Sequence, residues 1–583
     1  MSGAGSLPVR LLRRHPTLVV RFLGGSVGRA VLTSATILLI YQFLAAVLGQ
    51  SGGRVLQLLH GIGFEPSLGS VIVLLALTQI GAIALAFDSR VAEQRILTAV
   101  ESETMERMIS HILGLSIDFF DGRTHGEWLQ SVRADVTNLR IVAGAQCNLL
   151  LESLQALALI AVAIRLSPSL AVWAFFLVPV GAVPITVAAR RVLISSGKLR
   201  RGNAGIFDVL LQLVSGIRII KIYASEKLEA ARTGEQAHRF FGELEQMERT
   251  RSLARVAIDS LAGVNMIVVA VVGGMQVLHG SLRWPALLAF FLAARAVQGP
   301  LNNMNTAWME IRRNGASVDH IDALLRTTPT VRDAADARPL PAPPATIEAR
   351  EIAFARDGHP ILDGVSFSLR AGETLGIVGP SGAGKTTLLN LIARFYDPTS
   401  GAISLDGVDL RDLRLGDVHA RMAIVTQEPF LFAATVAENI ARGRPSASLD
   451  EIESAARAAE IHDDIVAMPD GYRTVVGHGG RALSRGEAQR INIARAIVKD
   501  APILLLDEAS SSLDLWTEAR VQKALDRLVV GRMVLSVAHR LSTVRNATRI
   551  LVLENGRAAG LGPHDELLAH CETYRRLWTA QSR

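Results

Sequence analysis

Stretches without a single Asp, Glu, Lys or Arg are concentrated in the first 310 residues of the chain. A helix needs about 20 mainly apolar residues to cross the hydrocarbon core of a bilayer. A soluble helical domain would instead need six buried helices of bilayer length in succession, which argues against that alternative. We therefore predict six membrane-spanning helices, at residues 30–49, 66–87, 146–165, 166–189, 258–280 and 284–305.

Basic residues indicate which ends of these helices face the cytoplasm. The segment 190–255 alone carries 13 Lys or Arg, whereas the loops after the first, third and fifth spans hold Arg54, Arg165 and Arg283. By the positive-inside rule, both termini are expected in the cytoplasm. The inner segments 88–148 and 190–255 are too long for simple connections, so we expect helices that continue beyond the membrane.

Composition narrows the class of protein. With 49% hydrophobic and 20% charged residues, this chain of 583 residues is not intrinsically disordered. Its net charge of +7 does not indicate a nucleic-acid partner, because the arginines flank apolar runs and so point to a lipid bilayer. The two cysteines, Cys147 and Cys571, are far apart and predict no disulfide framework.

The pattern changes after the apolar region. Five prolines between residues 329 and 344 mark a linker. Beyond it, short apolar strands such as 374–378 and 503–506 alternate with helical stretches, which is typical of an α/β domain with a mainly parallel sheet. We predict a multidomain membrane protein with a six-helix α transmembrane domain at 1–325, a linker at 326–345 and a soluble α/β domain at 346–583.

A phosphate-binding loop follows the first of these strands. Residues 379–387 read Gly-Pro-Ser-Gly-Ala-Gly-Lys-Thr-Thr and precede an apolar helix, which matches G-x-x-x-x-G-K-[ST] between a strand and a helix. Backbone N–H groups can surround a phosphate chain here, while Lys385 adds positive charge and the Thr386 hydroxyl can ligate magnesium. The predicted nucleotide contacts in this loop are Gly379, Pro380, Ser381, Gly382, Ala383, Gly384, Lys385, Thr386 and Thr387.

Two carboxylates end another apolar strand. Residues 503–508 read Ile-Leu-Leu-Leu-Asp-Glu. Asp507 can hold the shell of a magnesium ion, while Glu508 can polarise an attacking water. Together with the phosphate-binding loop, these residues predict that 346–583 is an α/β P-loop ATPase cassette.

With these motifs the chain resembles the ATP-binding cassette (ABC) transporters, and more narrowly the exporter-type half-transporters in which six helices precede one cassette. The most specific motif is Leu-Ser-Arg-Gly-Glu at 483–487, which is similar to the family signature. Gln427 matches the family's Q-loop, residues 511–514 its D-loop and His539 its switch histidine. The resemblance implies ATP and Mg²⁺ as cofactors, Glu508 and His539 as catalytic residues, further ATP contacts at Arg356, Gln427, Ser484, Gly486 and Asp514, and Mg²⁺ ligands at Thr386, Gln427 and Asp507.

The resemblance also implies a dimer. In the family, the signature of one chain faces the γ-phosphate that the other chain holds, so a monomer would lack a complete site. Residues 119–127 and 215–221 are similar to family segments in the two inner loops. Such loops carry coupling helices that dock on the cassettes.

Four positions depart from the family pattern. Arg485 replaces a glycine and Glu487 a glutamine in the signature, and His478 stands where an acidic residue is usual. Arg356 stands where the family generally offers an aromatic ring to adenine, although a guanidinium plane can also stack on a base. Because Glu508 is kept while the signature is altered, we favour a heterodimer with a second, non-identical half-transporter; a homodimer with two modestly altered sites is the alternative.

The resemblance implies ATP-driven export of a small amphipathic molecule, such as a lipid, peptide or drug, by alternating access in the bacterial inner membrane. The alternatives are import of a metal chelate or siderophore through an exporter-like fold, and a non-transporting membrane ATPase that regulates a partner protein. Ionisable residues inside spans are costly and normally face a cavity or a partner. Arg295 is thus either a contact for an anionic substrate, or a residue that pairs with an acidic side chain or snorkels to the interface.

Overall fold

The computed structural model describes residues 14–48, 68–121, 125–176, 209–210, 212–340, 342–477, 479–507, 515–538 and 541–581. The chain divides into two compact units. The first holds Met1–Leu113 and His125–Thr327, and the second holds Gly114–Thr124 and Thr328–Arg583. The short connection Gly114–Thr124 therefore packs with the C-terminal unit, although it joins two helices of the first.

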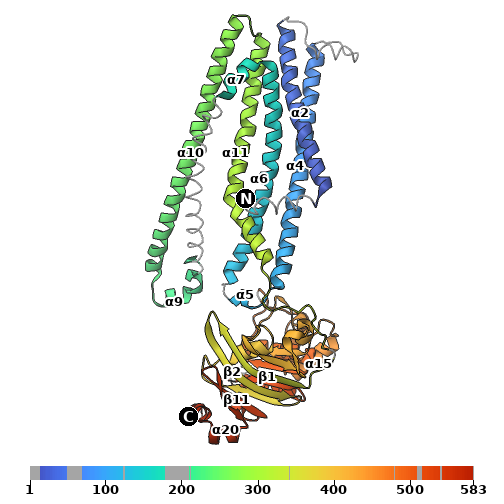
Figure 1. Cartoon of the computed structure of the whole chain (residues 1–583), viewed down its shortest axis with the longest axis vertical. Helices are drawn as coiled ribbons and strands as arrows, with labels where there is room; N and C mark the ends of the chain where they lie inside the picture. The colour runs from blue at the N-terminus through green and yellow to red at the C-terminus, as the bar shows by residue number, and fades with distance from the viewer. Residues whose placement is uncertain are drawn as a thin grey trace. The chain divides into compact units, whose positions relative to one another are not determined.

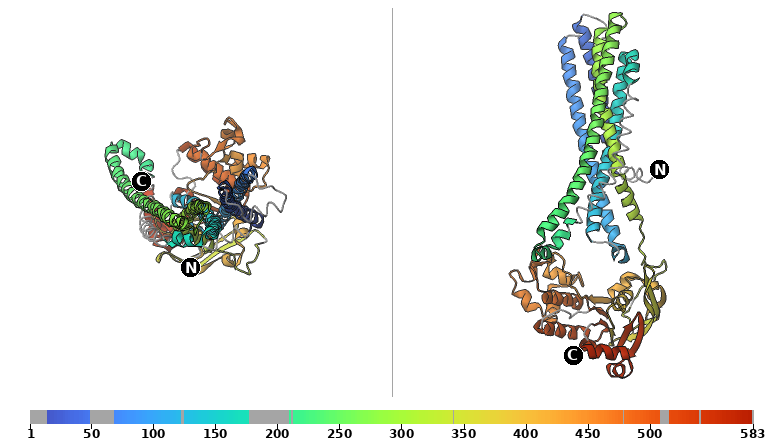
Figure 2. Two further views of the ribbon diagram at one scale, coloured as in Figure 1. Left: turned by 90° about the horizontal axis from the view of Figure 1, so that it is seen from above. Right: turned by 90° about the vertical axis from the view of Figure 1, so that its left-hand side faces the viewer.

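Helices build the described part of the first unit, and the long ones run side by side along its length (Figures 1 and 2). Two of them, α2 and α11, carry proline in their first two positions, where the missing N–H removes no helical hydrogen bond. The helices are α2 (Pro16–Val47), α4 (Leu68–Leu113), α6 (His125–Leu166), α7 (Pro168–Phe176), α9 (Ile217–Ile222), α10 (Glu226–Leu278) and α11 (Trp284–Arg326).

Most predicted spans correspond to helices in the described ranges. α11 covers the sixth span, and of the fourth span only the beginning, Pro168–Phe176, is described. α4 and α10 have 46 and 53 residues, more than a bilayer needs, as expected for helices that continue beyond it. Among the described residues, the helices that are long and apolar enough to cross a membrane overlap the first, second, third and fifth spans; they are Pro16–Val47, Gly69–Leu113, Val132–Leu166 and Asp259–Leu278.

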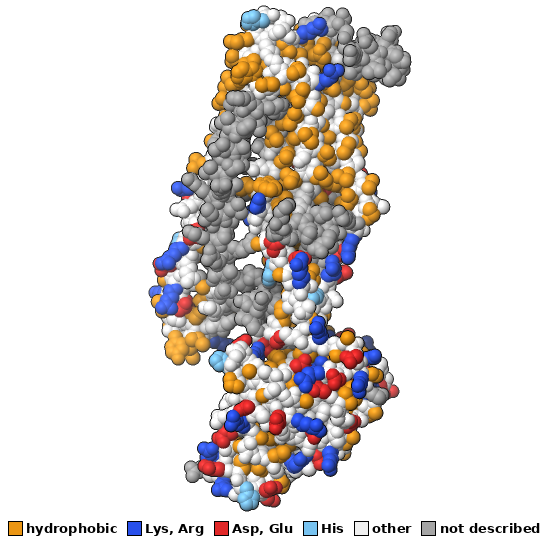
Figure 3. All heavy atoms as spheres, in the orientation of Figure 1, with side chains coloured by type: hydrophobic (Ala, Val, Ile, Leu, Met, Phe, Trp, Pro, Cys, Tyr) orange, Lys and Arg blue, Asp and Glu red, His pale blue; other side chains and the backbone are white. Residues whose placement is uncertain are grey.

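The outer surface of these helices is apolar. Figure 3 shows hydrophobic side chains gathered over α2 and α4. Soluble monomers rarely expose a contiguous apolar patch of this kind, and contact with lipid accounts for it. The exposed side chains on the two helices include Val31, Ile72, Leu77, Ile80 and Ile83.

Two polar contacts lie within the predicted spans, one buried and one exposed. Glu152 is only 4% exposed, and its carboxylate accepts a hydrogen bond from the Asn303 amide at 3.0 Å. The Arg295 guanidinium donates to the amide oxygen of Gln298 at 2.6 Å on an exposed face of α11. The partner seen for Arg295 is thus an amide on its own helix. The apolar core of the bundle includes Ile37, Leu159, Leu170, Val269, Phe290 and Val297.

The second unit contains a large, mainly parallel sheet, as the sequence predicts. Its strand order is β12-β11-β3-β10-β9-β6. Only its edge strand β12 is antiparallel to its neighbour. An antiparallel sheet of order β2-β1-β4-β5 and a small β7-β8 pair accompany it. The strands are β1 (Thr346–Arg356), β2 (His359–Arg370), β3 (Thr374–Val378), β4 (Ser400–Leu405), β5 (Val408–Asp409), β6 (Met422–Val425), β7 (Ala434–Thr435), β8 (Val475–Val476), β9 (Ile503–Asp507), β10 (Met533–Val537), β11 (Arg549–Glu554) and β12 (Arg557–Gly562).

The large sheet separates two apolar cores. Leu505 and Leu535 point into the core shared with α12 and the antiparallel sheet, whereas Leu504 and Val534 point into the core shared with α14, α15, α17 and α18. Both faces are covered, which explains why these strands are continuously apolar. The helices of this unit are α5 (Asp118–Asp121), α12 (Lys385–Ile392), α13 (Leu415–Ala420), α14 (Val436–Ala441), α15 (Leu449–Ala458), α16 (His462–Val466), α17 (Arg485–Lys499), α18 (Leu515–Val529), α19 (Leu541–Val544), α20 (His564–His570) and α21 (Glu572–Gln581).

Candidate functional site

Several predicted functional positions follow the carboxyl ends of adjacent parallel strands. β3 leads into Gly379, β9 ends at Asp507, and Gln427 comes two residues after β6. β10 lies between β3 and β9, and its chain continues towards His539. Ligands of open α/β sheets bind outside the carboxyl ends of the strands, so this edge is the candidate nucleotide site.

The loop after β3 has a backbone path that suits glycine. A Cβ on Gly379 would lie 2.2 Å from the carbonyl oxygen of Leu553. Gly384 has a φ of 93° and precedes α12, and a Cβ there would lie 2.7 Å from the Leu362 side chain. The tight strand-loop-helix turn is therefore present, and α12 begins directly after the loop that follows β3.

Lys385 is folded into this loop. Its side chain is nearly buried, and its Nζ donates to the carbonyl oxygens of Gly379 and Pro380, both at 2.9 Å. Ser381 and Thr386 are exposed. Phosphate oxygens are stronger acceptors than carbonyls for an ammonium group, so a bound triphosphate can take over its hydrogen bonds.

The signature segment 483–487 begins helix α17 in another layer of the cassette. The Ser484 hydroxyl accepts from the Glu487 N–H at 3.2 Å, and the Glu487 carboxylate accepts from the Ser484 N–H at 2.7 Å, which completes a capping box. Gly486 is buried, and a Cβ there would lie 2.0 Å from Thr517. Arg485 is exposed. The altered residue Glu487 thus fixes the local backbone.

Helix α17 is connected to the predicted Q-loop position. The Gln489 amide is buried and donates to the carbonyl oxygen of Thr426 at 3.2 Å, while the Asn492 amide donates to the Thr426 hydroxyl at 3.4 Å. Thr426 directly precedes Gln427. The sequence places Gln489 beside the signature but gives no sign of this contact.

Arg356 ends β1 and contacts the connection between α4 and α6. Its Nη2 lies 3.1 Å from a carboxylate oxygen of Asp121 in α5, and its guanidinium carbon lies 5.9 Å from the ring centre of Tyr396. The Tyr396 hydroxyl also donates to Asp121. Burial, followed by this hydrogen bond, raises the pKa of Tyr396 to about 12. Asp121 belongs to the segment 119–127, but nothing in the sequence indicates Arg356 or Tyr396 as its partners.

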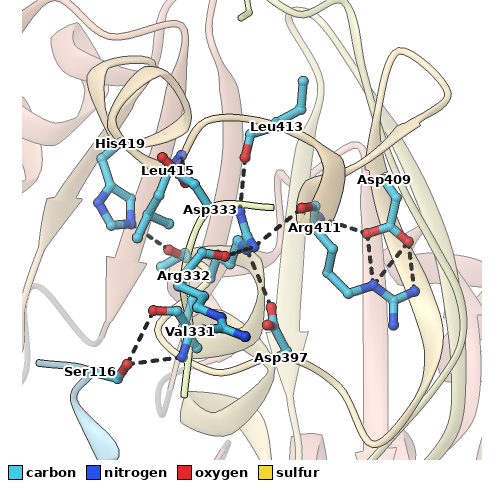
Figure 4. A network of polar contacts seen from close by, with 12 residues as sticks. Ser116, Val331, Arg332, Asp333, Asp397, Asp409, Arg411, Leu413, Leu415 and His419 are labelled. Atoms are coloured by element: carbon cyan, nitrogen blue, oxygen red, sulfur yellow. Dashed lines mark hydrogen bonds and ion pairs between the residues drawn. The ribbon is translucent and has the colours of Figure 1, made fainter. Parts of the chain in front are cut away.

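Figure 4 shows the beginning of the predicted linker bonded to the cassette. The Val331 N–H donates to the Ser116 hydroxyl at 2.9 Å, and that hydroxyl donates to the Val331 carbonyl at 3.3 Å. The buried Arg394 guanidinium donates to the carbonyl oxygens of Arg332 and Leu413, at 3.1 and 3.0 Å. The chain from Val331 onwards is therefore fixed to the cassette, while the predicted boundaries at 326 and 345 stay a prediction.

The predicted catalytic residues Glu508 and His539 and the predicted ATP contact Asp514 lie outside the described residues, as does His478. Among the described residues, no three or more His, Cys, Asp or Glu side chains gather into a group that could bind a metal. Thr386, Gln427 and Asp507 offer hydroxyl, amide and carboxylate oxygens, which are the donors that Mg²⁺ prefers. A Mg²⁺ ion that also binds nucleotide phosphates needs only a small number of ligands from the protein.

Comparison with known families agrees with this fold and this sheet edge. Residues 362–511 match the ABC transporter family model, and residues 23–301 match the ABC transporter transmembrane region. The chain belongs to the ABC transporter family. It fuses a helical transmembrane domain to a P-loop cassette that binds ATP and couples ATP hydrolysis to transport.

The relatives are flippases and exporters. The chain is 36% identical over 483 residues to the ATP-dependent lipid A-core flippase of Syntrophus aciditrophicus (strain SB), covering 83% of this chain and 80% of that protein. It is 32% identical over 480 residues to the putative multidrug export ATP-binding/permease protein YgaD of Bacillus subtilis (strain 168), covering 82% and 83%. A solved structure of a bacterial Atm1-family ABC exporter with ATP bound aligns with a TM-score of 0.82 and 27% identity over 97% of this chain and 98% of that one. These relatives support export and do not favour the importer or the non-transporting ATPase.

Proposed function

We propose that this chain is one half of an exporter that moves an amphipathic, lipid-like molecule across the bacterial inner membrane. The sheet edge carries the proposal, because the loop 379–387, Asp507 and Gln427 lie at the carboxyl ends of parallel strands of one sheet, on a chain whose long helices expose apolar side chains. The names of its relatives, lipid A-core flippases among them, favour a lipid over a peptide or drug.

In this proposal each group at the sheet edge has one role. The loop 379–387 holds the triphosphate of ATP, and Thr386, Gln427 and Asp507 hold Mg²⁺, which when bound neutralises phosphate charge. Glu508 orients the attacking water, and His539 completes the catalytic pair. A second chain completes this site with its own signature, and Ser484 and Gly486 of this chain contact the γ-phosphate of the ATP that the second chain holds.

The altered signature supports a non-identical partner. Two copies of this chain would form two sites that each combine an intact phosphate-binding loop with Arg485 and Glu487 in the opposing signature. A partner with an ordinary signature would form one fully competent site with the loop and Glu508 of this chain. Expression of the chain alone tests this, since a stable homodimer with robust, substrate-stimulated ATPase activity would remove the reason for a partner.

Transport is tested with inverted membrane vesicles from cells that express the chain. We expect ATP-dependent accumulation of labelled lipids in these vesicles, and loss of accumulation in the Lys385→Ala variant, whose loop lacks its buried ammonium. ATP-dependent depletion of a metal chelate from preloaded vesicles would support the importer instead. ATPase activity without movement of any candidate would support the regulatory ATPase.

A further inference from the structure

The end of the β1–β2 hairpin lies against the phosphate-binding loop. Phe354 of β1 pairs with Leu362 of β2, and Arg356 ends the same strand two residues later. The Leu362 side chain fills the space beside Gly384, the last glycine of the loop. Arg356 therefore stands at the end of a hairpin that packs on the loop proposed to hold the triphosphate.

Two side chains from separate segments contact the Arg356 guanidinium. Asp121 binds one edge of it at 3.1 Å, and Tyr396 presents its ring at 5.9 Å. Tyr396 is itself held by its hydrogen bond to Asp121 and by the Phe354 ring, whose centre lies 5.5 Å away. The Arg356 side chain still remains 42% exposed, so a planar group can reach it.

The position of Asp121 is set by the connection between α4 and α6. Within this connection, the Asp118 carboxylate accepts from the Thr330 hydroxyl at 3.0 Å, and Ser116 bonds to Val331. α4 and α6 are long helices of the first unit. The carboxylate that forms the ion pair with Arg356 thus belongs to a segment that is covalently joined to two membrane helices.

We propose that Asp121 is a specificity-determining positioning residue for the nucleotide, because it orients the Arg356 guanidinium as a stacking surface for the base. The inference rests on the proposed function and adds a consequence to it. Affinity for the base then depends on the position in which the α4–α6 connection holds Asp121. By thermodynamic reciprocity, binding of the base stabilises that position of the connection. An aromatic ring at position 356 would need no such carboxylate, since a ring has no charge to pair.

The test compares two ligands that share a phosphate chain but differ in the base. Binding of ATP and of inorganic tripolyphosphate is measured on the full-length chain in lipid nanodiscs with magnesium. Asp121→Asn should weaken ATP binding about twofold to fivefold, the range of a partly exposed ion pair, and leave tripolyphosphate binding unchanged. In the Arg356→Tyr background, Asp121→Asn should no longer affect ATP. Glu348→Gln, which breaks a carboxylate–arginine pair with Arg350 on the same strand, is the matched control and should change neither ligand.

The outcomes separate this inference from the proposed function. Equal losses for ATP and tripolyphosphate would show that Asp121 only supports the cassette structure, and an unchanged ATP affinity would also overturn the inference. Lys385→Ala serves as the second reference. If Lys385→Ala abolishes binding of ATP and tripolyphosphate while Asp121→Asn changes the binding of neither, only the role of Asp121 fails. If Lys385→Ala still binds both ligands, the proposed nucleotide site fails.

Discussion

Ser484 and Glu487 hold each other at the beginning of α17, with the serine N–H 2.7 Å and the serine hydroxyl 2.7 Å from the same glutamate oxygen. Both donors of Ser484 are therefore engaged by a negative charge of their own chain. A phosphate that approaches Ser484 from a partner chain has to compete with this carboxylate and is repelled by it. The departure at position 487 thus changes the charge of the signature without breaking its helix cap.

Replacement of this carboxylate by an amide should increase activity. In Glu487→Gln the side-chain oxygen can still accept from Ser484, so the capping box is kept while the charge is lost. We expect the ATPase rate of the assembled dimer to rise about fivefold, the effect of removing roughly 1 kcal/mol of repulsion. Glu487→Ala, which loses the cap, should instead lower stability by about 1 kcal/mol. Steady-state ATPase assays and thermal unfolding check both, and an unchanged rate in Glu487→Gln would argue against the repulsion.

Glu508→Gln should separate nucleotide binding from hydrolysis. Its amide cannot accept the proton of an attacking water, so turnover at this site should fall by about 10²- to 10⁴-fold while ATP binding persists. The variant should accumulate as an ATP-bound dimer in size-exclusion chromatography. Single-turnover measurements on the purified variant isolate this site from a site completed by a partner, and hydrolysis at the normal rate would refute the role.

The strand-loop-helix turn of the phosphate-binding loop could be predicted from the sequence, because all of it follows a single apolar strand. Glycines and Lys385 come directly after the apolar strand 374–378, so spacing alone places them at its end. Contacts between distant segments have no such local signal: Asp121 and Tyr396 are 275 positions apart, and only the docking of the connection on the cassette brings them together. The ends of helices could also not be predicted from the sequence. The apolar stretch 30–49 marks only the membrane part of a helix that begins at Pro16.

Acid should weaken the cassette through His419. Burial lowers the pKa of its imidazole, whose Nε2 lies 2.8 Å from the carbonyl oxygen of Ala393. The unfolded chain takes up a proton near pH 6.5, whereas the folded cassette resists it, so this contribution to stability is full above about 6.5 and is lost as the pH falls further. His419→Gln should therefore reduce the drop in melting temperature between pH 7.5 and pH 5.5.

The matched control for that experiment is His570→Gln, which changes an exposed histidine of α20. Melting curves of both variants and of the parent protein at the two pH values make the comparison. An equal pH dependence in the parent and in His419→Gln would exclude His419 as its source.

Arg394 should be the most sensitive arginine of the cassette. It is 2% exposed, and its donors bind Asp397 and the carbonyl oxygens of Arg332 and Leu413. Arg394→Met removes the buried donor of these contacts and should lower the free energy of unfolding by about 3 kcal/mol. Arg457→Met, which removes a 57% exposed arginine, should cost less than about 1 kcal/mol. Equal melting temperatures of the two variants would contradict this difference.

The predicted orientation in the membrane can be tested by cysteine labelling. Cys147 and Cys571 are both buried and unpaired, so they are first replaced by alanine. Arg54→Cys and Arg283→Cys should then react with an impermeant maleimide from outside the cell, and Arg200→Cys only from the cytoplasmic side. Labelling of all three from one face would rule out the six-span topology.

The fixed linker also limits how far the end of α11 can travel without moving the cassette. α11 ends at Arg326, and the carbonyl oxygen of Arg332 is already bonded to the buried Arg394 of the cassette, so only residues 327–331 lie between them. Five residues reach no more than about 18 Å when fully extended. This short tether limits the separation of its two ends by its covalent length alone. Lengthening it would therefore loosen the mechanical connection between membrane helix and ATPase while every residue of the nucleotide site stayed intact.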